Sequence, residues 1–192
     1  MVSNPRRRTT LLDAGIDVLA RLGARGLTFR AVDDEAGVPT GTTSNYFANR
    51  DALLRELGDH VFVRLAPDPA VVAERLAAPP SRALEVVLMQ DIVERAQADR
   101  SGYLAMFELR LEASRRPELE VAFTAGYRAN LDDITAAHVE GGFPGGDATA
   151  LLLYLAMNGL LLEHLTLPGV LPGGDSALPG LVQQLVETIV PE

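Results

Sequence analysis

The 192-residue chain contains no cysteine, which excludes a disulfide framework, a thiolate metal site and a cysteine nucleophile. It contains no lysine either, because all 17 basic residues are arginine. No apolar stretch of the signal-peptide type follows the basic N-terminus MVSNPRRRTT, so we expect no targeting segment. These absences permit a cytoplasmic location, which we predict, and we expect neither a metal nor another cofactor.

Sequence motifs of catalysis are missing as well. The three histidines, His60, His138 and His164, stand far apart in the sequence. None belongs to an H-x-x-x-H or H-E-x-x-H metal pair, and neither a G-x-S-x-G motif nor a P-loop is present. We therefore predict that the protein is not an enzyme. Turnover of a substrate would favour the alternative, an enzyme.

The chain does carry strong helical patterning. Hydrophobic residues make up 47% and charged residues 22%, as in an ordinary soluble globular protein. Period-two alternation with turn pairs is absent, whereas helical periodicity recurs between glycine and proline breakers. The predicted fold class is therefore all-α.

The net charge of -9 is unevenly distributed along the chain. Residues 1–50 hold seven arginines against five acids, a charge of +2, so the remainder carries ten arginines against 21 acids, or -11. The basic charge therefore lies near the N-terminus. Arg6, Arg7 and Arg8 form a short arm ahead of the first expected helix. Two interpretations of this arm stay open, namely phosphate or minor-groove contacts and a solvated tail.

A first helix is expected from about residue 8 to residue 22, where Leu12, Ile16 and Leu19 form an apolar stripe and Gly23 stops the helix. The three N-terminal helices should share one small core. Its expected members are Ile16, Leu19, Phe29, Val32 and Phe47.

Residues 28 to 53, TFRAVDDEAGVPTGTTSNYFANRDAL, predict a pair of short helices and the start of a longer one. Thr28 is placed to cap the first short helix, and Gly37 supplies the left-handed residue that ends it. Thr40 is placed to cap the second, and Asn49 is placed to cap the longer helix. The order is helix, tight turn containing glycine, helix.

The second short helix has an unusual surface composition, because hydroxyl and amide side chains stand where glutamate and lysine are common. Threonine and asparagine can bond the edges of bases, and Gly41 would let the backbone approach a phosphate. Tyr46 and Arg50 suit phosphate oxygens. A polar turn between two packed helices is the alternative interpretation of the same residues.

From Arg8 to Leu54 the chain resembles the N-terminal domain of the tetracycline-repressor (TetR) family of transcriptional regulators. The matching segments, in the family's order and spacing, are RTTLLDAGIDVLARLG, LTFRAV and EAGVPTGTTSNYFANRDALL. The resemblance implies a three-helix helix-turn-helix domain over residues 1–50 and a helical effector-binding and dimerisation domain over residues 51–192. It also implies that DNA is contacted at Thr28, Arg30, Thr40, Thr42, Thr43, Asn45, Tyr46 and Arg50.

The chain departs from the family pattern at three positions. The family usually has a small apolar residue where this chain has Asp33, and aromatics are common where it has Ser44 and Ala24. An unpaired buried carboxylate would be costly, so we expect Asp33 to be solvated or paired, with Arg30 or Arg8 as its partner.

Beyond Pro67 we expect six helices, over about residues 70–78, 82–99, 101–115, 117–140, 147–166 and 177–190. In the family, the middle of this region holds a small-molecule site. Apolar walls with a few polar groups describe a ligand pocket, although they equally describe a core. The candidate ligand-binding residues are His60, Met89, Asp91, Tyr103, Met106, Phe107, Arg110 and Tyr127. Arg110 and Asp91 favour a pocket only if they point inward.

The segment LLLYLAMNGLLLEHL, residues 151–165, is apolar almost all round but too short for a membrane span. A helix that is apolar on every side needs partners on every side, and a homodimer would supply them. The expected interface residues are Leu152, Leu155, Leu162, Leu181, Leu185 and Ile189.

The sequence thus predicts a ligand-responsive transcriptional regulator, a repressor by resemblance. Its expected partners are a double-stranded pseudo-palindromic operator, a second copy of the chain and a small apolar or amphipathic effector, with no membrane. The rival is a helical small-molecule-binding protein without operator binding, for which Asp33 and the overall acidity are the best support.

Overall fold

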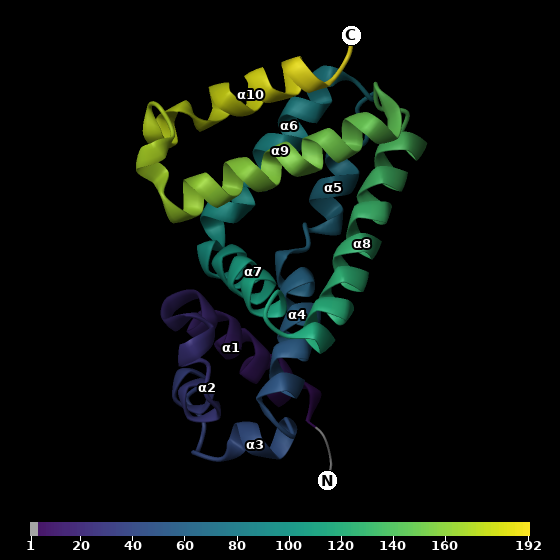
Figure 1. Ribbon diagram of the computed structural model, residues 1–192. Coiled ribbons are helices and arrows are strands. Elements are labelled where there is room, and N and C mark those ends of the chain that lie inside the picture. Colours follow the sequence, from purple (N-terminus) through teal and green to yellow (C-terminus); the bar gives the residue numbers. More distant parts are fainter. Residues whose placement is uncertain (1–3) are drawn as a thin grey trace. The chain divides into compact units, whose positions relative to one another are not determined.

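The computed structural model describes residues 4–192, and every regular element among them is helical (Figure 1). This confirms the predicted all-α class. The ten α-helices of the described residues are α1 Pro5–Gly26, α2 Phe29–Glu35, α3 Thr42–Tyr46, α4 Arg50–Leu65, α5 Pro69–Arg75, α6 Arg82–Ala98, α7 Arg100–Ala113, α8 Pro117–Glu140, α9 Gly146–Thr166 and α10 Leu178–Ile189. Two 3-10 turns, Pro168–Val170 and Gly174–Ala177, precede α10. From α5 onward the predicted bounds agree with these to within three residues.

The chain packs as two compact units. The first contains the residues up to Ala66 together with Asp99–Gly126, and the second contains Pro67–Ala98 and Tyr127–Glu192. Helix α7 and the start of α8 therefore pack with the N-terminal helices. The predicted domain division after residue 50 follows a different boundary and stays a prediction.

The core of the first unit follows the predicted apolar stripe. Ile16, Leu19 and Val32 are fully buried, and Phe47 is 1% exposed, whereas Phe29 is only half-buried. The predicted stop at Gly23 is a kink, because φ is 65° there and α1 continues for one further turn to Gly26.

The approach of α8 to α4 in the first unit requires a glycine. A Cβ on Gly58 would lie 2.2 Å from the Phe123 ring, far inside van der Waals contact. Phe123 is buried against this bare stretch of α4 backbone. The packing of α8 against α4 therefore depends on a residue without a side chain in α4.

The N-terminus of α7 is tied to α1 and α4 by charge. Asp99 caps α7 and accepts hydrogen bonds from the Arg64 guanidinium, Nε to Oδ2 at 2.6 Å and Nη2 to Oδ1 at 2.8 Å. The same guanidinium reaches Oδ1 of Asp17 at 3.0 Å. The hydrogen bonds from Arg64 lower the pKa of Asp99, which therefore stays ionised well below neutral pH.

In the second unit, α9 and α10 lie side by side and both contact α6 (Figure 1). A buried pair fixes the turn between α8 and α9, because His138 Nδ1 lies 2.8 Å from Oε1 of Glu85 and its Nε2 lies 3.2 Å from the Pro144 carbonyl oxygen. The ring also stacks on Phe143. Burial raises the pKa of Glu85, and the histidine opposes that rise.

Candidate nucleic-acid interface

The helix pair from α2 to α3 has most of the local signals that the sequence predicts. Thr28 caps α2, since its hydroxyl oxygen accepts a hydrogen bond from the Ala31 N–H at 3.1 Å. Gly37, with φ of 62°, ends the helix. Asn49 caps α4 by accepting from the Ala52 N–H at 2.8 Å. These three predictions are confirmed.

The predicted cap of α3 is wrong. Gly41, not Thr40, is the N-cap residue, and it has φ of 92° and no side chain to offer. A Cβ on Gly41 would meet nothing within 4 Å, so its left-handed backbone, and not crowding, requires glycine. The cap comes instead from α2, eight residues earlier in the sequence.

Asp33 supplies this cap. Its Oδ2 accepts a hydrogen bond from the Gly41 N–H at 2.7 Å. Its Oδ1 accepts from both the N–H and the hydroxyl of Thr43, at 2.7 and 2.5 Å. Only 1% of Asp33 is exposed, so the carboxylate exchanges water for three protein donors at the positive end of a helix.

The expected partners of Asp33 are therefore wrong. Arg30 lies 3.8 Å from Asp34, and Arg8 pairs with Glu56. Among the described residues, no ion pair to Asp33 is found. Hydrogen bonds from backbone amides can stabilise a buried carboxylate in place of a cation. A search of the sequence for oppositely charged partners does not find such hydrogen bonds.

The candidate DNA-binding residues separate into exposed and internal groups. Thr43 is fully buried and its hydroxyl is bound to Asp33, so its assignment to DNA is wrong. The structure leaves Thr28, Arg30, Thr40 and Asn45 exposed and leaves Gly41, Thr42 and Tyr46 partly exposed. Contact of these seven residues with DNA remains a prediction.

Arg50 is also used inside the protein. Its guanidinium donates to the carbonyl oxygens of Leu27, at 3.2 Å, and Ala24, and it lies 3.3 Å from Oε1 of Glu112. These contacts join the turn before α2, the start of α4 and the end of α7. Arg50 therefore has a structural role, and since its side chain is still 32% exposed, its contact with a phosphate stays a prediction.

The N-terminal arginines do not form an arm. Helix α1 begins at Pro5 with Asn4 as its cap, so Arg6 and Arg7 stand exposed on its first turn. Arg8 turns inward, where it bonds Glu56 and the Tyr46 carbonyl oxygen and lies 4.8 Å above the Phe47 ring. Arg8 thereby holds the C-terminal end of α3 to α1 and α4.

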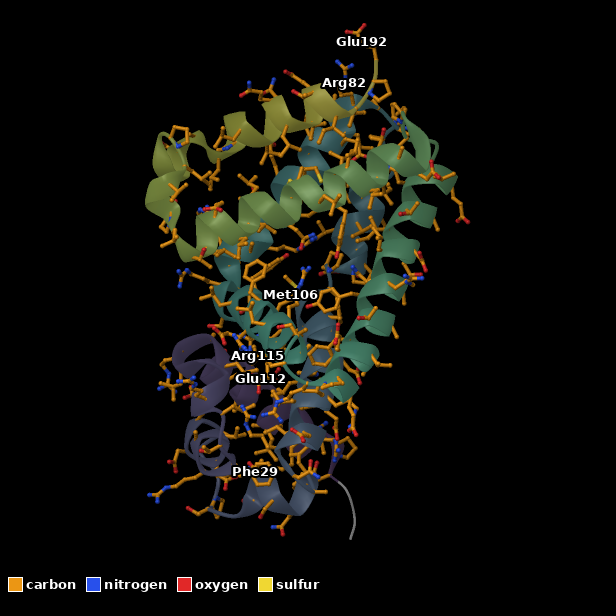
Figure 2. All side chains as sticks on the ribbon, in the orientation of Figure 1. Phe29, Arg82, Met106, Glu112, Arg115 and Glu192 are labelled. Atoms are coloured by element: carbon orange, nitrogen blue, oxygen red, sulfur yellow. The ribbon has the colours of Figure 1, made fainter. Side chains whose placement is uncertain are left out.

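Sequence reasoning missed Glu112, which gathers arginines at the end of α7. Its carboxylate lies 2.7 Å from Arg116, 3.3 Å from Arg50 and 3.8 Å from Arg115. Glu112 and Arg115 are labelled in Figure 2. Burial alone would raise the pKa of Glu112, but the hydrogen bonds from Arg116 and Arg50 bring it below its ordinary value. The spacing of Glu112 to Arg115 and Arg116, three and four residues, is a local signal, but the contact with Arg50, 62 residues away, has none.

The predicted ligand-binding residues are divided between the two units. The first unit holds His60, Tyr103, Met106, Phe107 and Arg110, whereas the second holds Met89, Asp91 and Tyr127. Arg110 is exposed, which contradicts the inward orientation that its role required. His60 lies 2.8 Å from Asp13, and Asp91 is paired with Arg75.

The second unit also has an open groove along α6 and α10, and none of the predicted ligand-binding residues lines it. Its walls are Gln90, Val93, Glu94, Gln97, Asp175, Leu178, Pro179 and Val182. The groove combines apolar side chains with two carboxylates and two amides, a surface of mixed character.

The predicted interface residues lie on α9 and α10. Leu152, Leu155 and Leu162 are 52%, 56% and 43% exposed, and the three residues from α10 are half-buried. By length and composition alone α9 would also pass as a membrane span, a test that core helices of soluble proteins pass as well. The single chain thus leaves a leucine surface uncovered.

Two family profiles match the chain. One, described as bacterial regulatory proteins of the tetR family, matches residues 11–57. The other, described as the C-terminal domain of tetracyclin repressor-like proteins, matches residues 80–192. Among curated proteins no significant match was found.

Solved structures match almost the whole chain. A member of the TetR family from Streptomyces coelicolor A3 is 24% identical, with a TM-score of 0.70 over 98% of this chain and 100% of its own, which is a likeness of fold. The multidrug-binding protein EbrR complexed with ethidium is 28% identical, with a TM-score of 0.66 over 95% and 99% of the two chains. Its complex with malachite green is 26% identical, with a TM-score of 0.66 over 98% and 100%.

The internal role of Arg50 predicts a stability effect. Arg50→Ala should lower the free energy of unfolding by about 1–2 kcal/mol, because it removes the hydrogen bonds to the Leu27 and Ala24 carbonyls and one of the cations paired with Glu112, which keeps Arg116. The matched control is Arg30→Ala, which removes an exposed guanidinium and should change stability by less than about 0.5 kcal/mol. Urea unfolding followed by circular dichroism measures both, and equal effects would contradict the structural role.

Proposed function

We propose, because the chain belongs to the tetracycline-repressor family of transcriptional regulators, that it is a repressor whose operator binding is controlled by a small molecule. It binds a pseudo-palindromic operator as a homodimer and leaves that operator when an effector binds. The observation that supports this most directly is the surface of α3, a short helix with exposed hydroxyl and amide groups at the end of a helix-turn-helix.

The side chains available on α3 suit the major groove. Asn45 is exposed and can bond the N6 and N7 edge of adenine through both atoms of its amide. Thr42 and Thr40 each offer a hydroxyl and a methyl group, and the methyl can contact thymine. Arg30, which is 81% exposed, and the arginines of the first turn of α1 supply positive charge for phosphates.

Two features of the chain favour a dimer, namely the short helix α3 and the exposed leucines of α9. One short reading helix makes few base contacts, whereas two helices on a twofold axis reach successive major grooves about 34 Å apart. The exposed leucines of α9, together with α10, give the self-complementary apolar surface that such an axis requires. We assign this surface to a four-helix interface between two copies of the chain.

The effector is proposed to be an aromatic cation or a related amphipathic molecule. Ethidium and malachite green, which EbrR is seen to bind, are both positively charged aromatic dyes. Residues 51–192 of this chain carry a net charge of -11, which favours a cation electrostatically. Of the predicted ligand residues, Tyr103 and Met106 are buried and apolar enough to contact such a ring system.

Release requires that the effector prefer a conformation in which the two reading helices are wrongly spaced. Helix α4 begins beside α3 and carries the movement in this scheme. The regulator works in the cytoplasm, where the operator is.

A helical small-molecule binder that has lost operator binding is the second candidate, and the acidic net charge favours it. Asp33 no longer supports it, because the residue caps α3 instead of disturbing the helix pair. Specific DNA binding decides between the two functions.

Replacement of Asn45 should weaken operator recognition. An operator fragment is first selected from random DNA by the wild-type protein. Asn45→Ala should bind it about tenfold to a hundredfold less tightly, while its binding to unrelated DNA stays unchanged. Gln97→Ala, which removes an exposed amide from α6, is the control and should bind as wild type does.

Fluorescence anisotropy over a salt series measures these affinities. Enrichment of no sequence by the wild-type protein would refute operator binding and favour the second candidate.

A charge placed in the uncovered leucine surface should separate the dimer. Leu155→Glu puts a carboxylate at a 56% exposed position of α9 and should shift the mass in sedimentation equilibrium from dimer to monomer. Val121→Glu introduces the same charge at a 73% exposed apolar position of α8 and should leave the mass unchanged. A Leu155→Glu variant that remains dimeric would show that the interface lies elsewhere.

Binding of cationic dyes tests the effector class. Equilibrium dialysis without DNA should give micromolar dissociation constants for ethidium and malachite green, and a neutral aromatic of similar size should bind at least tenfold less tightly. Saturating dye should then release the selected operator. Ethidium also intercalates into DNA, so an unrelated DNA-binding protein on its own site serves as the control for release. Absence of dye binding would contradict this class of effector.

A further inference from the structure

We propose that Asp33 is a positioning residue for DNA reading, one that sets the orientation of α3 from inside the protein. The inference rests on the proposed function, because it concerns how the same reading helix is held. It adds Asp33, a buried residue, to the residues that determine the specificity of operator binding.

Helix α3 depends on contacts outside itself. It spans only the five residues Thr42–Tyr46, far below the length at which a helix is stable alone. Its N-cap residue, Gly41, has no side chain, so the first turn has no cap of its own. The exposed hydroxyls of that turn bond carbonyls of the same turn, Thr42 to Pro39 at 2.5 Å and Ser44 to Gly41 at 2.7 Å. None of these bonds fixes the turn to the rest of the unit.

The Asp33 carboxylate makes that connection. Two N–H groups of the first turn and the Thr43 hydroxyl all point at its two oxygens, at 2.5 to 2.7 Å. Thr43 is buried as a result, and this fixes the rotation of α3 about its axis. Thr42, Ser44 and Asn45 are then on the side away from Asp33, where they are partly or fully exposed.

The other end of α3 is held separately. Arg8 donates to the Tyr46 carbonyl oxygen at 3.3 Å, and Phe47 is buried directly after the helix. With both ends fixed, the reading side chains face outward before DNA arrives. Such preorganisation favours specific binding, because less ordering remains to be done on the DNA.

Asp33 and its neighbour Asp34 provide a matched comparison. Both belong to α2 and carry the same charge, but Asp33 is buried whereas the side chain of Asp34 is 65% exposed. A carboxylate near a phosphate backbone repels it, so electrostatics alone predicts tighter DNA binding when either acid is replaced by asparagine. Positioning predicts the opposite result for Asp33 only.

The substitution Asp33→Asn acts on the cap with little change in volume. An amide oxygen can still accept hydrogen bonds, but the amide nitrogen is a donor and cannot accept from an N–H. Whichever way the amide turns, one backbone N–H, that of Gly41 or that of Thr43, therefore loses its acceptor, although the Thr43 hydroxyl can rotate to accept from the amide nitrogen. The first turn of α3 is released while the surrounding core is kept.

The experiment compares wild type, Asp33→Asn and Asp34→Asn on the selected operator and on unrelated DNA, below the unfolding temperature of every variant. Asp33→Asn should bind the operator about tenfold to a hundredfold less tightly and should keep its affinity for unrelated DNA, so its specificity ratio falls by the same factor. Asp34→Asn should bind both DNAs as tightly as wild type or slightly more tightly.

Amide hydrogen exchange supplies a readout that general destabilisation does not imitate. Exchange at whichever amide loses its acceptor, Gly41 or Thr43, should accelerate at least tenfold in Asp33→Asn, while amides of α1 and α4 keep wild-type rates. An operator specificity equal to that of Asp34→Asn would overturn the positioning role, as would unchanged exchange at both amides. Failure of the wild-type protein to select any operator would instead overturn the proposed function, so the two failures are distinct.

Discussion

The orientation of α3, the proposed DNA-reading helix, depends on one buried carboxylate that meets the N-terminus of this five-residue helix. Asp33 exchanges hydration for two backbone N–H groups and one hydroxyl, which is the kind of compensation that a buried charge needs. The N–H groups of Gly41 and Thr43 and the Thr43 hydroxyl donate to Asp33, so fewer hydrogen-bond donors of this turn remain for DNA. This arrangement leaves Thr42 partly exposed and Asn45 exposed, and under the proposed function base recognition by α3 is concentrated on a small set of side chains.

Two arginines near the N-terminus of this lysine-free chain connect helices of the first unit. Of the seven arginines in residues 1–50, Arg8 and Arg50 are bound inside the first unit and Arg21 pairs with Glu35. The positive charge that can reach DNA is therefore smaller than the sequence count suggests. Because each phosphate contact adds to the salt dependence, a dimer of this chain should have a shallow salt slope and rely more on base contacts.

Local signals in the sequence are sufficient to predict the helices. The sequence does not reveal hydrogen-bond partners that are distant along the chain. Thr28 and Asn49 were predictable as caps because each bonds an N–H three residues ahead. Asp33 was not, since its partners lie eight and ten residues away across a turn. The family resemblance assigns Thr43 to DNA, and only the three-dimensional path of the turn shows that the residue is buried.

The position of α7 bears on how a signal reaches the reading helix. Arg64 holds the N-terminal cap of α7 to α1 and α4, and Glu112 holds its C-terminal end to Arg50. Since these pairs occupy both ends, α7 cannot shift along α4 without leaving partly buried charges unpaired, which is costly. A ligand that displaces α7, for example through Tyr103 or Met106, would therefore move α1 and α4 with it. Displacement of the first unit as one body requires no change within α3, so the cap at Asp33 can remain intact while the spacing of two reading helices changes.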